Sequence, residues 1–220
     1  MPGTRKQTVF TLPDAVPVYP LSGVLLLPSA TLPLDIVEPH HCAMVEDALA
    51  EGRHMALVQP VSSRPGEAGL YRVGCLGRII SFLETGEGRY EIGLLGLRRV
   101  HLLDEQACDR GYRRFSLRAE DLPAGEPQDS AFLFDDLDDL DTFFDTLSAY
   151  AETYSIGFDH EVLRSIPAQN LVNALCMACP FDPREKQALL EAENLRARAV
   201  LLHNLLQISL RSPLSSDSTQ

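Results

Sequence analysis

The stretch PVYPLSGVLLLP at residues 17–28, followed closely by LPLDIVEP at residues 32–39, decides the fold of this chain. Both are apolar runs that proline interrupts at short intervals. Because proline lacks the backbone N–H that a β-ladder uses, runs of this kind form bent edge strands and loops rather than one long central strand. The first part of the chain is therefore expected to be irregular β-structure, interrupted at Pro17, Pro20, Pro28 and Pro33.

Short-strand signals continue to about residue 121, with one exception. Pro39 opens a helical pattern that Gly52 ends, and a strand is expected at residues 54–59. The polar sequence at 85–88 predicts a hairpin turn. Glycines recur through the hairpin region, and they permit the coiling and close backbone approach that a small barrel needs; they stand at 74, 77, 93 and 96.

The second half of the chain has helical patterns. The polar segment LPAGEPQDS at 122–130 predicts a linker. Beyond it, apolar residues recur at intervals of three and four, as in Leu140, Phe144 and Leu147. Asp182 predicts the start of a later helix, because Pro and Glu follow it at the positions of a capping box, and a break is expected near Asn194.

These patterns together predict an α+β protein in which a β-rich part, with glycines that suit a small barrel, precedes a helical bundle. The expected divisions are a β-rich subdomain at 15–121, the linker at 122–130 and a bundle at 131–210. Residues 1–14 and 211–220 are expected to be flexible, because they are short and polar.

The charge of the chain disfavours nucleic acid as a partner. The net charge is −12, and residues 119–163 carry 13 acidic and no basic side chains. Such a segment repels phosphate backbones, whose binding depends on clustered Lys and Arg.

No apolar run is long enough to span a membrane, no signal peptide is evident, and the five cysteines do not suggest a disulfide framework. A cytoplasmic protein is expected.

The residues that catalysis needs are not arranged for it. The chain has two lysines, Lys6 and Lys186, and neither lies in a phosphate-binding loop or beside a candidate serine nucleophile. Cys176 and Cys179 have the spacing of half a zinc site or of a redox pair, but they end an apolar helix, so core packing is favoured. We expect no catalytic residue, no metal site and no cofactor.

His40, His41 and Cys42 are further potential metal ligands. Adjacent side chains on a helix point in different directions, which disfavours joint chelation. Surface or partly buried positions are expected for them.

The run Val24, Leu25, Leu26, Leu27 and Pro28 admits two interpretations. A short apolar run beside prolines is hard to cover on both faces in a small barrel, and exposed apolar surface often marks a binding site. The alternative is an ordinary buried strand. We take the run as a candidate polypeptide contact.

Two arginines of the β-rich part, Arg78 and Arg99, are candidates for steering acidic groups of a bound peptide toward that contact.

The proline-rich opening also resembles the start of the Lon protease N-terminal (substrate-binding) domain family. The blocks YRVGCLGRI at 71–79 and GRYEIGLLGLRR at 88–99 resemble later blocks of that family, and EKQALLE at 185–191 is similar to its helical part. The resemblance covers roughly residues 15–207. The sequence departs from the family at His40–His41 and at Val100.

The resemblance implies a PUA-like pseudo-barrel, a helical bundle and a non-catalytic role in recognising unfolded or tagged polypeptides. A full-length Lon protease is then a further candidate partner, and self-association of the chain stays open. Two alternatives remain: an RNA-binding PUA-like protein, and a thiol- or metal-dependent enzyme that uses Cys176 and Cys179.

Overall fold

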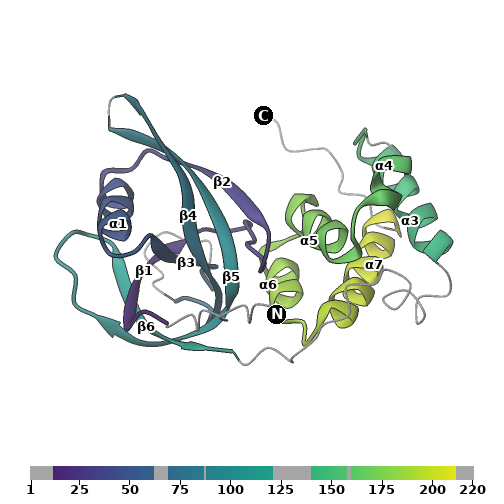
Figure 1. Cartoon of the computed structure of the whole chain (residues 1–220). Coiled ribbons are helices and arrows are strands. Elements are labelled where there is room, and N and C mark those ends of the chain that lie inside the picture. Colours follow the sequence, from purple (N-terminus) through teal and green to yellow (C-terminus); the bar gives the residue numbers. More distant parts are fainter. Residues whose placement is uncertain (1–11, 62–68, 87, 121–139, 158–159, 212–220) are drawn as a thin grey trace, which may run out of the picture.

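The computed structural model describes residues 12–61, 69–86, 88–120, 140–157 and 160–211. Strands dominate its first part and helices its second (Figure 1). The strands are β1 (Ala15–Pro20), β2 (Thr31–Ile36), β3 (His54–Val58), β4 (Val73–Gly86), β5 (Arg89–Gln106) and β6 (Arg113–Ala119). The helices are α1 (Pro39–Ala50), α3 (Leu140–Thr153), α4 (His160–Ser165), α5 (Ala168–Ala178), α6 (Pro183–Glu191) and α7 (Leu195–Arg211). The expected α+β class, with strands before helices, is confirmed.

The six strands form one sheet that closes on itself. Their order is β2-β5-β4-β3-β1-β6, and β5 also pairs with β6. This double pairing is possible because β5 is 18 residues long, so that Thr31–Ile36 of β2 pairs with its first half and β6 with its second. Register shifts in β4 and β5 add the coiling that closure requires. The result is a pseudo-barrel, as the family resemblance implies.

Strands that contain proline are expected at the edge of the sheet, and this holds for β2 but not for β1. β2, which contains Pro33, is an edge strand among the described residues, as expected. β1 is not, because it lies between β3 and β6. Its residues 15–18 pair with β6 and its residues 18–20 pair with β3. The two partners use successive halves of the strand, so a short strand with two prolines still fits inside the sheet.

Close backbone approach explains the glycines of the hairpin strands. A Cβ atom at Gly96 would lie 2.1 Å from the backbone oxygen of Leu27, and one at Gly74 would lie 2.8 Å from that of Leu57. Both distances are far below van der Waals contact. Gly96 therefore allows the loop before β2 to lie directly on β5, where Ser29 N–H donates to the Gly96 carbonyl over 2.8 Å.

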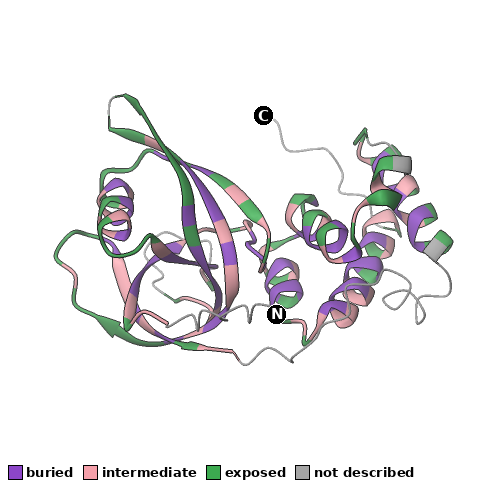
Figure 2. Cartoon of the chain, in the orientation of Figure 1, coloured by how far each residue is buried: buried purple, intermediate pink, exposed green. Residues whose placement is uncertain are grey.

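One apolar core runs from the barrel into the helices. It combines Leu26 and Leu94 from the β-rich part with Leu171, Leu189 and Leu202 from α5, α6 and α7. A second, smaller cluster fills the other side of the sheet around Val18 and Val100. In Figure 2 buried positions occur along the strands of the β-rich part and along the helices, including α5 and α6. The two parts therefore share buried surface.

The helix boundaries follow local chemistry. The Asp182 side chain accepts hydrogen bonds from the backbone N–H groups of Arg184 and Glu185, and the Glu185 side chain accepts one from the Asp182 N–H, so the expected capping box is confirmed. The expected break near Asn194 is also confirmed, since α6 ends at Glu191 and α7 begins at Leu195. The linker at 122–130 and the first part of the bundle lie outside the described residues, so the proposed division stays a prediction.

Removal of the cap should be measurable. Asp182→Ala should lower stability by about 1 kcal/mol, because two backbone N–H groups lose their acceptor. This corresponds to a fall of about 2–4 °C in Tm for a chain of this size. Circular-dichroism melts would check this against Asp145→Ala, which removes an exposed aspartate from α3. An equal Tm for the two variants would contradict the importance of the cap.

Candidate functional site

The apolar run at residues 24–28 lies inside the molecule. Leu25, Leu26 and Leu27 are buried, while Val24 and Pro28 are partly covered. The run packs between β5, which Gly96 lets it approach, and the helices, where Asn173 donates to the Pro28 carbonyl over 3.0 Å. Of the two interpretations, burial is the one that holds for Leu25, Leu26 and Leu27, because the helical part covers the side that a barrel alone would leave open. The run lies in a loop between β1 and β2, and not in a strand.

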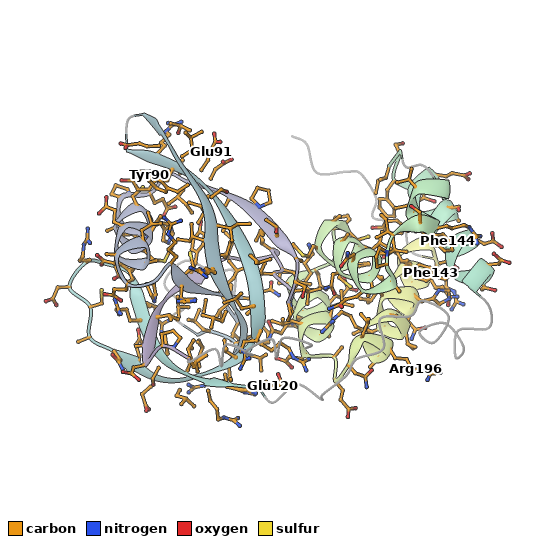
Figure 3. All side chains as sticks on the ribbon, in the orientation of Figure 1. Tyr90, Glu91, Glu120, Phe143, Phe144 and Arg196 are labelled. Carbon is orange, nitrogen blue, oxygen red and sulfur yellow. The ribbon has the colours of Figure 1, made fainter. Side chains whose placement is uncertain are left out.

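Arg99 is buried and does not have the exposed position that its predicted steering role needs. Only 3% of its surface is exposed, and its guanidinium group donates to the carbonyl oxygens of Leu190, Ala192 and Glu193 just beyond and within the end of α6. It also forms an ion pair with Glu120 at 2.9 Å. Figure 3 labels Glu120 at the end of the β-rich part that faces the helices. Arg99 therefore holds the two parts together and cannot steer a peptide.

Arg78 keeps the accessibility that its predicted role needs. Its side chain is exposed on β4, and its register partner is Leu95 of β5, which in turn pairs with Thr31 of β2. Arg78, Leu95 and Thr31 thus form one row of cross-strand neighbours. The next row on the same face belongs to an exposed sheet surface that the sequence did not reveal.

That surface spans the outer faces of β2, β4 and β5, and we call it the outer sheet face. It is a depression of about 570 Å³ with Gly93 near its middle. Ser81 and Pro33 flank Gly93 in register, and Leu83 and Asp35 flank Glu91 in the next row. Leu83 is 57% exposed and Phe82 is 40% exposed, so two neighbouring large apolar side chains of the lining are accessible. The complete lining is Thr31, Pro33, Leu34, Asp35, Ser81, Phe82, Leu83, Glu91, Ile92 and Gly93.

The hairpin that carries this face extends beyond the body of the barrel. Phe82 stacks on Tyr90 at a centroid distance of 4.9 Å, and Tyr90 donates to Glu46 of α1 over 2.9 Å. Figure 3 shows Tyr90 and Glu91 at this projecting end. These contacts hold the hairpin against α1, so the outer face is a supported surface.

The free edge of β2 borders the outer sheet face. The Gly96 N–H donates to the Ala30 carbonyl, so residue 30 points its backbone groups toward β5. In an antiparallel pair every second residue does so, and residues 32, 34 and 36 therefore also direct their N–H and C=O groups toward β5. The backbone groups of Thr31, Pro33 and Asp35 then face outward. Pro33 brings no N–H to this edge, which limits uncontrolled strand addition but leaves three carbonyl groups and two N–H groups available.

A second pocket lies on the other side of this edge. It has a volume of about 410 Å³ and shares Thr31 and Pro33 with the outer sheet face. Its far wall is α5, where Ala174 and Met177 contribute apolar surface. Uncharged residues line it throughout: Ser29, Ala30, Thr31, Leu32, Pro33, Asn170, Asn173, Ala174, Met177 and Ala178. The β2 edge thus stands between two hollows, one partly charged and one neutral.

The cysteine pair is buried rather than reactive. Cys176 and Cys179 are free thiols in the core, and burial raises the pKa of Cys176 to about 12 and that of Cys179 to about 11. A thiol with a raised pKa is a poor nucleophile. Lys186 is buried nearby and donates to the Met177 carbonyl over 3.0 Å. Their burial confirms the core-packing interpretation of the two cysteines.

One sequence signal could have revealed the outer sheet face. Residues 79–83 read IISFL, so apolar side chains occupy successive positions of a hairpin strand. Successive strand residues point to opposite faces, so such a run cannot be buried on one side alone. Ile80, Phe82 and Leu83 are indeed exposed large apolar residues.

Comparisons with known proteins agree on the type of domain. Residues 15–207 match the family model of the ATP-dependent protease La (LON) substrate-binding domain. Lon protease 2 of Myxococcus xanthus is 26% identical over 200 residues, which cover 89% of this chain and 24% of that protein. Lon protease 2 of Sorangium cellulosum is 35% identical over 95 residues, which cover 40% and 12%. The chain therefore spans about a quarter or less of these relatives.

Solved structures show the same fold. The Lon N-terminal domain protein from Xanthomonas campestris superposes with a TM-score of 0.55 at 20% identity, covering 88% of this chain and 97% of that one. The N-terminal domain of the Mycobacterium avium complex Lon protease gives 0.61 at 16% identity, covering 88% and 98%. With the family model matched over most of its length, this chain belongs to the Lon substrate-binding domain family.

Proposed function

We propose that this protein is a non-catalytic module that binds unfolded or extended polypeptides at the outer sheet face and the adjoining β2 edge. The observation that carries the proposal is that the exposed side chain of Leu83 lies on the same sheet face as β2, whose outer edge is unpaired among the described residues. Exposed apolar area provides a favourable contact for unfolded chains, and an edge strand provides backbone hydrogen bonds that do not depend on sequence. The combination suits a ligand defined by its unfolded state.

The charges around the site favour polypeptide over nucleic acid. Asp35 and Glu91 both line the outer sheet face, and Arg78 lies one row away. Two carboxylates repel a phosphate backbone, whereas they attract basic side chains of a peptide. This arrangement supports the polypeptide proposal and argues against the RNA-binding alternative.

The domain family also supports a protease as a partner. The relatives that match this chain are named Lon proteases, and the matched region is their substrate-binding domain. We infer that the protein presents bound polypeptides to a protease of this type. Lys186, Cys176 and Cys179 are all buried, so none of these three side chains is placed to act as a catalytic base or nucleophile on a polypeptide.

The binding site can be tested with a single substitution. Leu83→Asp should weaken binding of a reduced, carboxymethylated model protein at least about tenfold, because it replaces an apolar contact with a charge beside Glu91. Its Tm should stay within about 2–4 °C of the wild type, since the side chain is exposed. Fluorescence anisotropy of the labelled model protein would give the affinities, and circular-dichroism melts would give the Tm values.

A matched control comes from the helical part. Ile208 of α7 is 55% exposed, about as much as Leu83, and it lies away from the outer sheet face. Ile208→Asp should keep the wild-type affinity. Equal affinity of Leu83→Asp and the wild type, or equal losses in both variants, would reject the proposed site.

A further inference from the structure

Three potential metal ligands meet where β2 leads into α1. The Glu38 Oε2 atom lies 3.2 Å from His40 Nε2 and 3.3 Å from His41 Nδ1. The three ligand atoms all lie within 4.8 Å of one another, and no other such group of three occurs among the described residues. The convergence is independent of the outer sheet face and of the peptide-binding proposal.

The local backbone explains how neighbouring imidazoles come together. Glu38 is the N-cap of α1 and has an extended conformation, and Pro39 occupies the first helical turn. The backbone N–H groups of His41 and Cys42 both donate to the Glu38 carbonyl over 2.9 Å. The Glu38 side chain can therefore reach both rings, whose centroids are 4.0 Å apart. The expectation that these side chains diverge is wrong, because they lie at the helix start rather than in its interior.

We propose that Glu38, His40 and His41 form a Zn²⁺ site. Tetrahedral zinc with bonds of about 2.0–2.1 Å separates its ligand atoms by about 3.3 Å. Both Glu38-to-histidine distances already match that spacing. Two imidazoles and one carboxylate are a ligand set that zinc accepts, with the fourth position open.

The surroundings restrict the orientation of His41 and leave His40 and Glu38 accessible to an ion. The side chain of His41 is 17% exposed, and its ring packs edge-on against Tyr19 at 4.6 Å, which restricts its orientation. The side chains of His40 and Glu38 are 43% and 58% exposed, so an ion can enter and a water molecule can complete the coordination.

Two features of the site work against tight binding. The N-terminus of a helix has a partial positive charge, which disfavours a cation there. Cys42 does not supply a ligand to the site, because its Sγ donates to the Gly88 carbonyl at 3.1 Å. The proposed site is therefore a three-ligand surface site of moderate affinity.

The experiment is titration of ZnCl₂ into the full chain after treatment with a chelator, followed by isothermal calorimetry. We expect one ion per chain with a dissociation constant below about 100 µM. The variants His41→Ala and His40→Ala/His41→Ala should bind at least about tenfold more weakly. His101→Ala, which changes a histidine of β5 outside the group, should bind as the wild type does.

Two further readouts separate a true site from a folding effect. Co²⁺ in place of zinc should give the visible absorption of a tetrahedral centre in the wild type and lose it in the double variant. Glu38→Gln keeps the backbone cap and changes an exposed side chain, so it should fold normally and still weaken zinc binding. Wild-type binding weaker than about 100 µM, or equal binding by wild type and double variant, overturns the proposal.

Discussion

Leu27→Asp is expected to unfold the protein. Leu27 is fully buried, and its backbone oxygen lies against β5 where Gly96 leaves room for it. Deletion of a buried leucine side chain alone costs about 2–5 kcal/mol. Burial of a carboxyl group without a partner adds several kcal/mol more. The total approaches the whole stability of a typical domain, which is about 5–15 kcal/mol.

The measurement pairs two leucine-to-aspartate variants of the same chain. Far-UV circular dichroism and size-exclusion chromatography should show Leu27→Asp as unfolded or aggregated at 25 °C. Leu83→Asp, which makes the same chemical change at a 57% exposed position, should remain folded. A cooperative melt of Leu27→Asp close to that of the wild type would contradict the burial of this segment.

Elements whose causes lie within a few residues could be predicted from sequence. The capping box at Asp182 and Glu185 needs only those side chains and the backbone between them. The hairpin between β4 and β5 needs only turn residues, and Gly86 and Gly88 have the positive φ angles, 93° and 72°, that favour glycine there. Such features do not depend on what the rest of the chain does.

The burial of residues 24–28 could not be predicted in the same way. The sequence of an apolar run does not show whether the run is covered by its own barrel, by a distant helix or by a ligand. Here the cover comes from Asn173, 145 residues from Pro28, and from the start of α6, where Gln59 donates to the Pro183 carbonyl over 2.8 Å. Gln59 also accepts from Gly23 N–H at 3.0 Å. Only the packing of the two parts decides which apolar run is hidden.

The candidate site was missed for a related reason. The successive apolar residues at 79–83 indicate that one face of the hairpin is exposed, but the sequence does not give the register with β2. The structure places Pro33 and Asp35 beside Gly93 and Glu91, and this pairing creates the outer sheet face. Cross-strand neighbours come from distant parts of the chain, so their charges and shapes combine only after folding.

No helix among the described residues is long and apolar enough to cross a membrane.

Arg99→Ala is the second substitution with a large expected effect, and its target is the junction of the two parts. The guanidinium group satisfies the carbonyl oxygens of Leu190, Ala192 and Glu193 around the end of α6, and it pairs with Glu120. Cations stabilise helix C-termini, and each buried carbonyl group left without its charged donor costs about 1–3 kcal/mol. Glu120 is 32% exposed and adds little, so we expect a total loss of about 3–5 kcal/mol. The Tm should therefore fall by about 6–20 °C.

Two comparisons show whether this loss comes from the forked geometry of Arg99. Arg118→Ala removes an exposed arginine from β6 and should leave the Tm nearly unchanged. Arg99→Lys keeps the charge but offers a single ammonium group to several carbonyls, so it should recover less than half of the lost stability. Hydrogen exchange should also rise first in α6, where the carbonyl groups lose their donor, before it rises in β5. If Arg99→Lys matched the wild type in both Tm and exchange, charge alone would hold the two parts together; a loss in both would show that the shape of the guanidinium group is required.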